Sequence, residues 1–286
     1  MGEPVKLGFN LLLWTTHVTD EHWPIIERLK ATGYDGVEIP MFEGEPAHYS
    51  RLGTRLRDLG FASTGIGVLP AGKSAISADP AERRAALDHI KWLIDCTAAL
   101  GGDVAAGPFH QTLGVFSGTG PTADEQQRCA EIHKQAAQYA ASGSIRLAVE
   151  PLNRFECYFL NTAAQATELV KAVDEPNYGY LYDTFHFNIE ENSLPDAIAA
   201  TAPQIGHVHI SENNRGVPGA GHIDFASVFR ALRDVGYDGW MTVEAFGSAL
   251  PDLAAATKIW RPLFARDADV YEGAFRLMRR GWDATT

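Results

Sequence analysis

The sequence predicts an α/β protein built as a (β/α)8 TIM barrel, and three observations carry this prediction. The chain has 286 residues, which suits a barrel of about 250 residues with insertions. Short apolar runs alternate with longer stretches of helical periodicity along its whole length. No linker, low-complexity segment or change of composition interrupts this alternation, so we expect one barrel domain over residues 1–286.

Eight segments have the length and the β-branched or aromatic content of buried strands. In order they are LGFNLLLW (7–14), GVEIP (36–40), FASTGIGV (61–68), GDVAAGPF (102–109), IRLAVEPL (145–152), YGYLYDTF (178–185), IGHVHIS (205–211) and WMTVEAF (240–246). An open doubly wound sheet is the alternative, but it more often carries a glycine-rich phosphate loop. GIG at 65–67 and GAG at 219–221 lack the third glycine of such a loop.

Between the strands lie amphipathic segments with the 3.6-residue period of helices. They include residues 20–33, 80–101, 124–143 and 161–174, and a segment at 267–281 predicts an extra C-terminal helix. Several helical segments end at glycine, a common helix C-terminal residue: Gly33, Gly60, Gly101, Gly143 and Gly236. The junction G-Y-D-G occurs at 33–36 and again at 236–239, which indicates equivalent turns in a ring.

The composition argues against several classes of protein. Formal net charge is −12, the sequence pI is about 5.2 and no Lys/Arg-rich run occurs, so we expect no nucleic-acid partner. No apolar stretch approaches the roughly 18 residues of a membrane span, and the apolar N-terminal run lacks the features of a signal peptide. The cysteines, Cys96, Cys129 and Cys157, are widely spaced, which argues against a disulfide framework and predicts a cytoplasmic protein.

Chemically capable side chains stand at the ends of four consecutive predicted strands. They are Glu150, Asp183, His209 and Glu244, each about one strand-and-helix repeat from the next. Active sites of TIM barrels lie at the C-terminal ends of the strands. Because side chains alternate along a strand, the polar residues can face the barrel axis while large apolar ones face the helices. Asp183 is the less clean case, since it shares its face with Leu181.

Three carboxylates that face one another repel strongly unless a cation lies among them. Oxygen ligands with one imidazole suit Mn²⁺, Mg²⁺ or Co²⁺ better than a thiolate-binding metal. The sequence therefore predicts a divalent-metal site at the barrel mouth, with His209 as the ligand and His207 one layer below it. Each residue alone has a structural alternative, because a strand-end Glu is often in an ion pair and an inward His is often a hydrogen-bonded core residue.

Four stretches carry a resemblance to a known family. LAVEPLNRFE (147–156), YDTFHFNIEE (182–191), HVHISENNRGVPGAGHIDF (207–225) and GYDGWMTVEAF (236–246) contain E-x-x-N-R-x-E, D-T-x-H-x-N-I-E-E and H-x-x-E-x-x-R in order. The chain resembles the D-tagatose/D-allulose 3-epimerase family of xylose isomerase-like TIM barrels. The resemblance covers the second half fully and the first half more loosely. The polar segment 105–121 departs from the family pattern, so the resemblance leaves the ketose open.

The resemblance implies roles for individual residues. Glu150, Asp183, His209 and Glu244 match the metal ligands, usually of Mn²⁺, and Glu150 and Glu244 also match the acid/base pair. Glu156, His186 and Arg215 match residues that hydrogen-bond the ketose. Weaker substrate-contact candidates are Glu38, His110, Gln111 and Trp14, and candidate apolar walls are Phe9, Phe109, Phe155 and Phe246. Family members are commonly dimers or tetramers, so we expect a homodimer or homotetramer.

The resemblance implies epimerisation of a free ketose at C3. Metal chelation of the C2 carbonyl acidifies the C3 proton, and two carboxyl groups on opposite sides can remove it and return it. The alternatives are an aldose–ketose isomerase, or a lyase or epimerase acting on another keto-sugar or keto-inositol. Structural alternatives also remain, in which Arg215 pairs with Glu212 and Glu156 pairs with Arg154. An endonuclease on this barrel would need a basic groove, against which the net charge argues.

Overall fold

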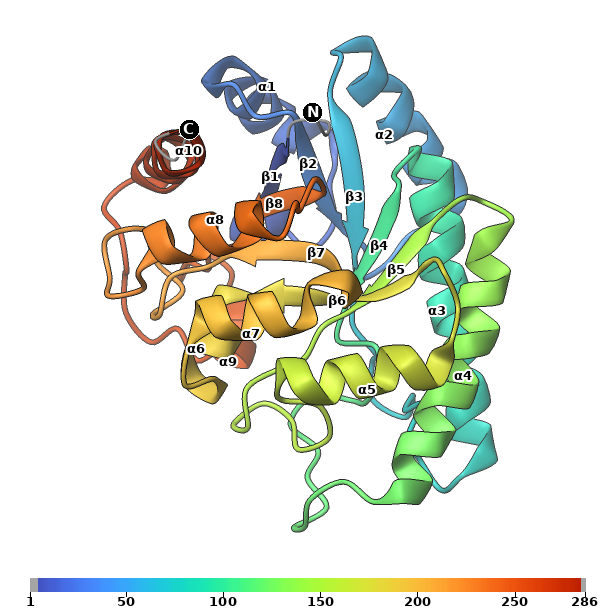
Figure 1. Cartoon of the computed structure of the whole chain (residues 1–286). Helices are drawn as coiled ribbons and strands as arrows, with labels where there is room; N and C mark the ends of the chain where they lie inside the picture. The colour runs from blue at the N-terminus through green and yellow to red at the C-terminus, as the bar shows by residue number, and fades with distance from the viewer. Residues whose placement is uncertain (1–4, 284–286) are drawn as a thin grey trace.

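Eight parallel strands close into a barrel in the order β1 to β8, and helices surround it (Figure 1). The computed structural model describes residues 5–283, so the first four and last three residues of the predicted domain lie outside the description. The strands are β1 (Lys6–Asn10), β2 (Gly36–Pro40), β3 (Ala62–Ile66), β4 (Val104–Gly107), β5 (Arg146–Val149), β6 (Tyr178–Asp183), β7 (Ile205–Ile210) and β8 (Trp240–Val243). The predicted fold class and all eight predicted strand positions are confirmed.

Each strand is followed by helical structure, as a (β/α)8 barrel requires. The helices are α1 (Trp23–Thr32), α2 (Pro46–Asp58), α3 (Pro80–Leu100), α4 (Ala123–Ala141), α5 (Ala163–Val173), α6 (Thr184–Glu190), α7 (Leu194–Thr201), α8 (Phe225–Asp234), α9 (Pro251–Thr257) and α10 (Asp267–Asp283). The extra C-terminal helix is α10, which starts at the predicted residue and ends two residues later than predicted. It lies against α1 and α8 and covers that side of the barrel (Figure 1).

Two local predictions were wrong for identifiable reasons. The first strand stops at Asn10, because Asn10 caps a 3-10 turn over Leu11–Leu13 by accepting a hydrogen bond from the Leu12 amide. Helix α4 ends at Ala141, two residues before the predicted Gly143, and the left-handed residue of the following turn is Ser144, with φ 57°. At Gly33 and Gly101 the prediction holds, since both close their helices in the left-handed conformation.

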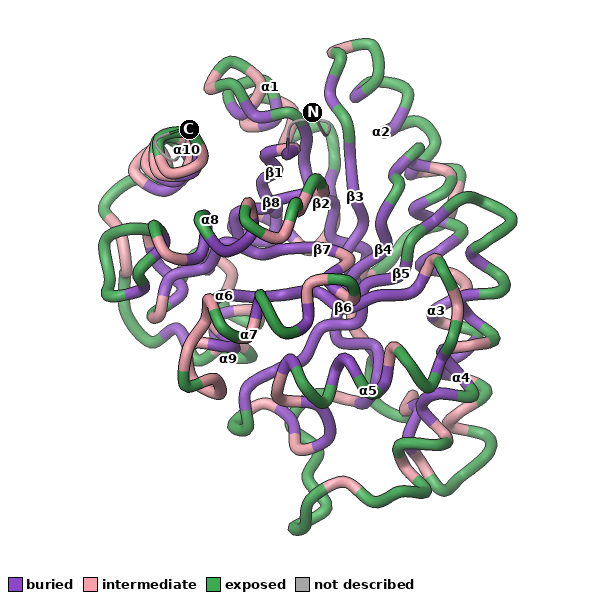
Figure 2. The backbone as a smooth tube through the Cα atoms, viewed as in Figure 1, coloured by how far each residue is buried: buried purple, intermediate pink, exposed green. Residues whose placement is uncertain are grey.

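The strands are buried on both faces, whereas the helices expose their outer faces to solvent (Figure 2). The barrel interior contains two different layers. Its lower layer is an apolar cluster formed by Val104, Ala106, Ala148, Leu181 and Trp240. Further along the same strands the inward residues become polar: Asp183 pairs in register with His209, and Leu181 with the deeper His207. The barrel therefore presents its polar residues at the C-terminal ends of the strands.

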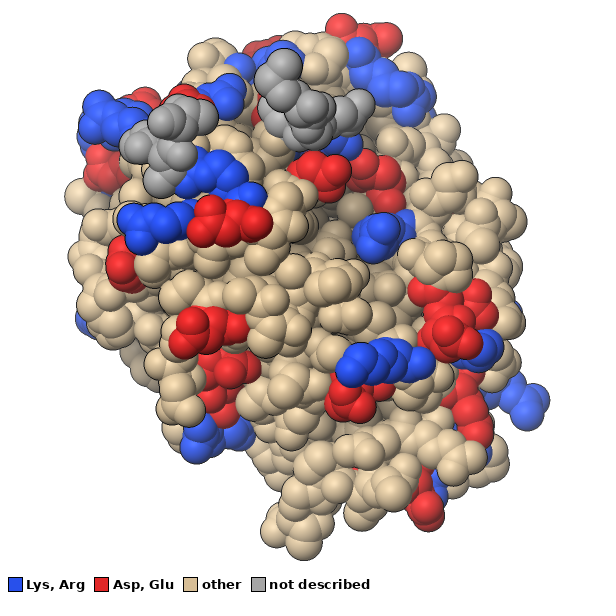
Figure 3. Space-filling view, in the orientation of Figure 1, with Lys and Arg blue, Asp and Glu red and all other residues tan. Residues whose placement is uncertain are grey.

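The molecular surface mixes charges of both signs. On the face drawn in Figure 3, Lys and Arg side chains lie among Asp and Glu side chains, without a continuous basic field among the residues described. Within residues 5–283, no helix combines the length and the apolar character needed to cross a membrane. Cys96, Cys129 and Cys157 are all buried and free of disulfides.

Candidate active site

The four predicted metal ligands converge at the barrel mouth. Glu150, Asp183, His209 and Glu244 each offer one ligand atom, and these atoms lie within 4.8 Å of one another. Asp183 and His209 belong to the last residues of β6 and β7, while Glu150 and Glu244 directly follow β5 and β8. All four are buried. The parallel register therefore brings together residues that are far apart in the chain.

His209 supplies the observation that tests whether this cluster fits a metal ion. Its Nδ1 atom is buried, makes no hydrogen bond, and faces Asp183 Oδ2 at 3.6 Å and Glu244 Oε1 at 3.5 Å. Burial opposes a charge on this ring, yet Glu38 and Glu244 raise the pKa of His209 well above its usual range. A basic nitrogen without a partner, aimed between two carboxylates, is a donor suited to a divalent cation. The residues fit a metal ion.

Arg215 lies against the same carboxylates. Its Nη1 atom donates to Asp183 Oδ2 at 3.1 Å and to Glu244 Oε2 at 2.5 Å. Although burial works against the ionised form, Arg215 holds the pKa of Asp183 well below its usual range. The guanidinium is also stacked over the rings of Phe185 and Phe246, at 4.0 and 4.9 Å. Arg215 thus points into the predicted site.

The loop after β7 holds Arg215 in this place. Arg215 has a left-handed backbone with φ 64°, an uncommon conformation for a residue with a side chain. The buried carboxylate of Glu212 accepts from the amides of Asn213, Gly219 and Ile223. Glu212 therefore organises the loop through its backbone, and the alternative in which its side chain pairs with Arg215 is not what the structure shows.

Glu150 and His186 form the other side of the site. Burial and the neighbouring Glu244 raise the pKa of Glu150 well above its usual range. His186 Nε2 lies 3.5 Å from Glu150 Oε1 and 2.7 Å from Arg215 Nη2. Burial and Arg215 lower the pKa of His186 well below its usual range, so His186 is a neutral ring between a carboxyl group and a cation.

Asn153 connects this side to Glu156. The Asn153 amide donates to His186 Nδ1 at 3.0 Å, and its side-chain Nδ2 donates to Glu156 Oε1 at 2.9 Å. Arg154 pairs with Glu190, at 2.9 Å, which removes the alternative pairing of Arg154 with Glu156. Nδ1 of His186 therefore accepts from the Asn153 amide, while its Nε2 faces Arg215. Asn153 was present in the sequence motif but was given no role.

A second buried group lies directly below the four predicted metal ligands. Glu38, His207 and His209 bring one ligand atom each within 4.8 Å of one another. Glu38 Oε1 lies 2.7 Å from His209 Nε2, and Glu38 Oε2 lies 2.9 Å from His207 Nε2. Burial opposes ionisation, but the two histidines hold the pKa of Glu38 well below its usual range. This placement favours Glu38 as a partner of His209 over a substrate contact.

The remaining sequence candidates lie around the site in structural roles. His110 Nε2 bonds the Glu150 carbonyl at 3.1 Å, and burial lowers the pKa of His110 to about 3. Gln111 donates to the Val115 carbonyl within the 105–121 segment, and Trp14 donates to Asp267. Phe9 and Phe109 are core residues, whereas Phe155 is 73% exposed. Asn10, which sequence reasoning missed, donates to Glu244 Oε1 at 2.9 Å; its place at a strand end was the available signal.

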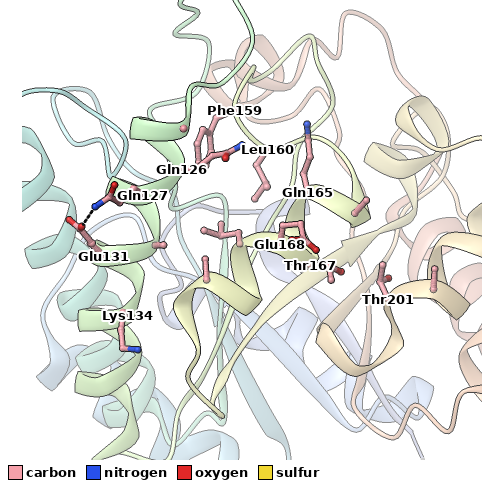
Figure 4. Close-up of a pocket in the computed structure, with 16 residues that line it drawn as sticks. Gln126, Gln127, Glu131, Lys134, Phe159, Leu160, Gln165, Thr167, Glu168 and Thr201 are labelled. Atoms are coloured by element: carbon pink, nitrogen blue, oxygen red, sulfur yellow. Dashed lines mark hydrogen bonds between the residues drawn. The ribbon is translucent and has the colours of Figure 1, made fainter.

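The structure also has a groove far from this chemistry. It lies between α4 and α5 on the outer surface, and its wall includes Phe159, Leu160 and Thr167 (Figure 4). Gln127 and Glu131 also line it, and Gln127 Nε2 donates to Glu131 Oε1 at 2.9 Å. None of the predicted site residues lines it. The groove therefore has no part in the site described here.

Comparison with known proteins shows the family of the chain. Residues 26–269 match the family described as xylose isomerase-like TIM barrel, to which the chain belongs. It is similar to the L-ribulose 3-epimerase of Mesorhizobium japonicum, with 33% identity over 264 residues, 91% of this chain and 88% of that protein. A solved L-ribulose 3-epimerase structure matches with a TM-score of 0.91 and 30% identity, over 98% of this chain and 95% of that one.

A solved structure of D-psicose 3-epimerase in the presence of D-fructose gives a TM-score of 0.86 and 31% identity, over 96% of this chain and 97% of that one. The resemblance to ketose 3-epimerases is confirmed by these relatives. The protein is accordingly an enzyme of the isomerase class, an epimerase.

Proposed function

We propose that the protein is a metal-dependent ketose 3-epimerase that interconverts C3 epimers of a free ketose, of the D-tagatose/D-sorbose or D-fructose/D-allulose type. The carrying observation is the buried group of Glu150, Asp183, His209 and Glu244, in which the two glutamates come from different strands. The names of the similar proteins support the reaction, and the D-fructose used with one of them supports the substrate class.

In this proposal the four ligands hold one divalent ion, Mn²⁺ by preference, with Mg²⁺ or Co²⁺ as alternatives. When bound, it would polarise the C2 carbonyl and acidify the C3 proton. One of Glu150 and Glu244 removes the proton from one face of C3, and the carboxyl group of the other donates a proton to the opposite face.

Hydrogen-bonding residues orient the ketose around these two glutamates. Arg215 and His186 offer N–H donors to the C2 oxygen, because both have nitrogen atoms directed into the site. Glu156 accepts from a sugar hydroxyl while Asn153 holds its other side. The near-complete burial of Glu150 and Glu244 keeps bulk water away from the reacting carbon.

The test uses the protein loaded with Mn²⁺ and incubated with D-fructose, D-tagatose and related free ketoses in D₂O. We expect the C3 epimer, with deuterium at C3. Deuterium at C1 together with an aldose would establish an aldose–ketose isomerase instead. If none of the free ketoses takes up deuterium, the protein would instead be a lyase or epimerase of another keto-sugar or keto-inositol. Removal of the ion with a chelator should abolish turnover, and added Mn²⁺ should restore it.

We also propose a cytoplasmic location and a homodimer or homotetramer. The absence of disulfides among the described cysteines suits a reducing compartment. The oligomer rests on the resemblance to ketose 3-epimerases, and light scattering of the purified protein tests it.

A further inference from the structure

The two histidines of the β7 strand face a single carboxylate that crosses the barrel from β2. Glu38 Oε1 lies 2.7 Å from His209 Nε2, and Glu38 Oε2 lies 2.9 Å from His207 Nε2. Thr64 of β3 donates to Oε2 at 3.0 Å. Glu38, His207 and His209 have no solvent exposure. The carboxylate of this β2 residue is therefore held from β3 and β7, in a layer without solvent exposure between the mouth and the apolar lower layer.

The chemistry of this contact fixes where the protons of His209 lie. An ionised carboxylate only accepts hydrogen bonds, so the proton in the 2.7 Å contact belongs to His209 Nε2. The other nitrogen, Nδ1, then faces Asp183 and Glu244 and is the atom available to a cation. An acceptor at Nε2 also increases the basicity of the ring and sets its orientation. One buried contact thus decides which nitrogen can bind.

We propose that Glu38 is the positioning residue of the metal site: it fixes the tautomer and orientation of His209, and His207 and Thr64 hold Glu38 in place. This inference rests on the proposed function in that it takes His209 as a ligand. His207 contributes less than Thr64 or His209, because its Nε2 atom is close to Oε2 without the alignment of a hydrogen bond. Glu38 acts through His209 and does not touch the substrate.

Measured Mn²⁺ affinity tests the role of Glu38 independently of turnover. Titration calorimetry should show Glu38→Leu binding Mn²⁺ about 10- to 100-fold more weakly than the wild type, the usual range for losing the partner of a metal-bound histidine. Glu38→Gln keeps one acceptor oxygen and should regain part of this loss. The absorption spectrum of bound Co²⁺ should change in the same order, since it reports ligand orientation. Affinity within about twofold of wild type for both variants would overturn the proposal.

Thr242→Val provides a matched control. Thr242 is buried, stands beside His209 in the strand register, and its hydroxyl has no hydrogen-bond partner. Replacing it removes an inward polar atom from the same layer without touching Glu38, so Mn²⁺ affinity should stay at the wild-type level. If Thr242→Val weakens binding as much as Glu38→Leu, the effect reflects general damage to the layer and the positioning role is wrong. Circular dichroism checks that each variant is folded, and Glu38→Gln serves if the leucine variant is not.

A double-mutant cycle tests the place of His207. His207→Phe alone should weaken Mn²⁺ binding less than Glu38→Leu, and it should add nothing in the Glu38→Leu background. Additive losses would contradict a role exerted through Glu38. The wild type should bind one Mn²⁺ per chain; a second equivalent that disappears in Glu38→Leu would assign Glu38 and His207 to an ion of their own.

The two proposals fail in different ways. Tight Mn²⁺ binding that depends on Glu38, without turnover of any ketose, would leave the positioning role standing and remove the proposed reaction. Turnover of a ketose, with the same Mn²⁺ affinity in Glu38→Leu as in the wild type, would leave the proposed reaction standing and remove the positioning role.

Discussion

The two layers of the barrel interior are built from the same strands and are both buried, yet one is apolar and the other is polar. In the lower layer, Ala148 and Leu181 pack with Trp240 in a buried apolar cluster. Two residues further along the same strands, Glu150 and Asp183 enter the buried polar cluster at the mouth. The difference is a single repeat of the side-chain alternation. It shows that one strand can supply both core packing and chemistry.

The comparison also shows what each layer does for the molecule. Burying apolar side chains stabilises the fold by roughly 25 cal/mol for each Å² removed from water. Burying several carboxylates costs stability unless hydrogen bonds or cations compensate. Asn10 and Arg215 supply part of that compensation at Glu244. We therefore expect substitutions at the mouth to change turnover and those in the lower layer to change stability.

The largest effect is expected at the two glutamates. Glu150→Gln and Glu244→Gln should each reduce kcat by about 10²–10⁴-fold, the usual contribution of a general acid or base, while the unfolding midpoint shows the fold to be intact. Steady-state assay with the preferred ketose measures this. The exposed Glu168 of α5 gives a control, since Glu168→Gln should be fully active. Full activity in either catalytic variant would remove the two-base mechanism.

Arg215 comes next. Arg215→Lys keeps a positive charge but loses the planar guanidinium that contacts Asp183 and Glu244 at once. Each lost charged hydrogen bond costs about 1.5–3 kcal/mol, so we expect kcat/KM to fall by about 10- to 100-fold. An unchanged kcat/KM in Arg215→Lys would show that a positive charge alone suffices at this position. A lower Tm with unchanged kcat/KM would show that Arg215 stabilises the fold and does not contribute to turnover.

Leu181 tests the lower layer. Leu181→Ala should cost about 2–5 kcal/mol of unfolding free energy, because it leaves a cavity in a fully buried cluster. Its kcat, per folded molecule, should remain near wild type. Leu181→Met conserves volume and should cost less than about 1.5 kcal/mol. Urea unfolding and the ketose assay together decide; a large loss of kcat in folded Leu181→Ala would break the division between the layers.

His133 is a buried histidine outside the barrel mouth, and we expect it to affect the pH dependence of stability. It lies on α4, with Nδ1 2.5 Å from the Tyr178 hydroxyl and Nε2 3.0 Å from the Phe109 carbonyl. Burial lowers the pKa of His133 to about 4. The unfolded chain, with a His pKa near 6.5, then binds the proton first, so stability is present above about pH 6.5 and is lost as the pH falls toward 4.

Urea titrations at pH 7 and pH 4.5 measure this loss. Wild type should lose about 2 kcal/mol more over this range than His133→Gln, which cannot take up the proton. The buried His110, whose pKa is lowered to about 3, contributes a loss of the same sign in both proteins. Equal pH dependence in wild type and variant would show that His133 is protonated as easily in the folded state as in the unfolded chain.

The sequence by itself determined the barrel and the position of its chemistry. Apolar periodicity placed all eight strands, because buried parallel strands are short apolar runs separated by helices. Alternation along those strands then placed Glu150, Asp183, His209 and Glu244 on the inner face. These properties are local, so each is visible in a stretch of a few residues. The end of the first strand was missed because a cap at Asn10, a side-chain contact, stops it.

Only the tertiary structure decided how the inward residues pair. Glu38 reaches His209 across the barrel over 171 positions of sequence, and Asn10 reaches Glu244 over 234. The left-handed Arg215 enters the site because Glu212 folds its loop, not because of its spacing from His209. Such contacts arise from the closure of the barrel, which brings distant strand ends together; a strand's own sequence records which face a side chain takes, but not what it meets there.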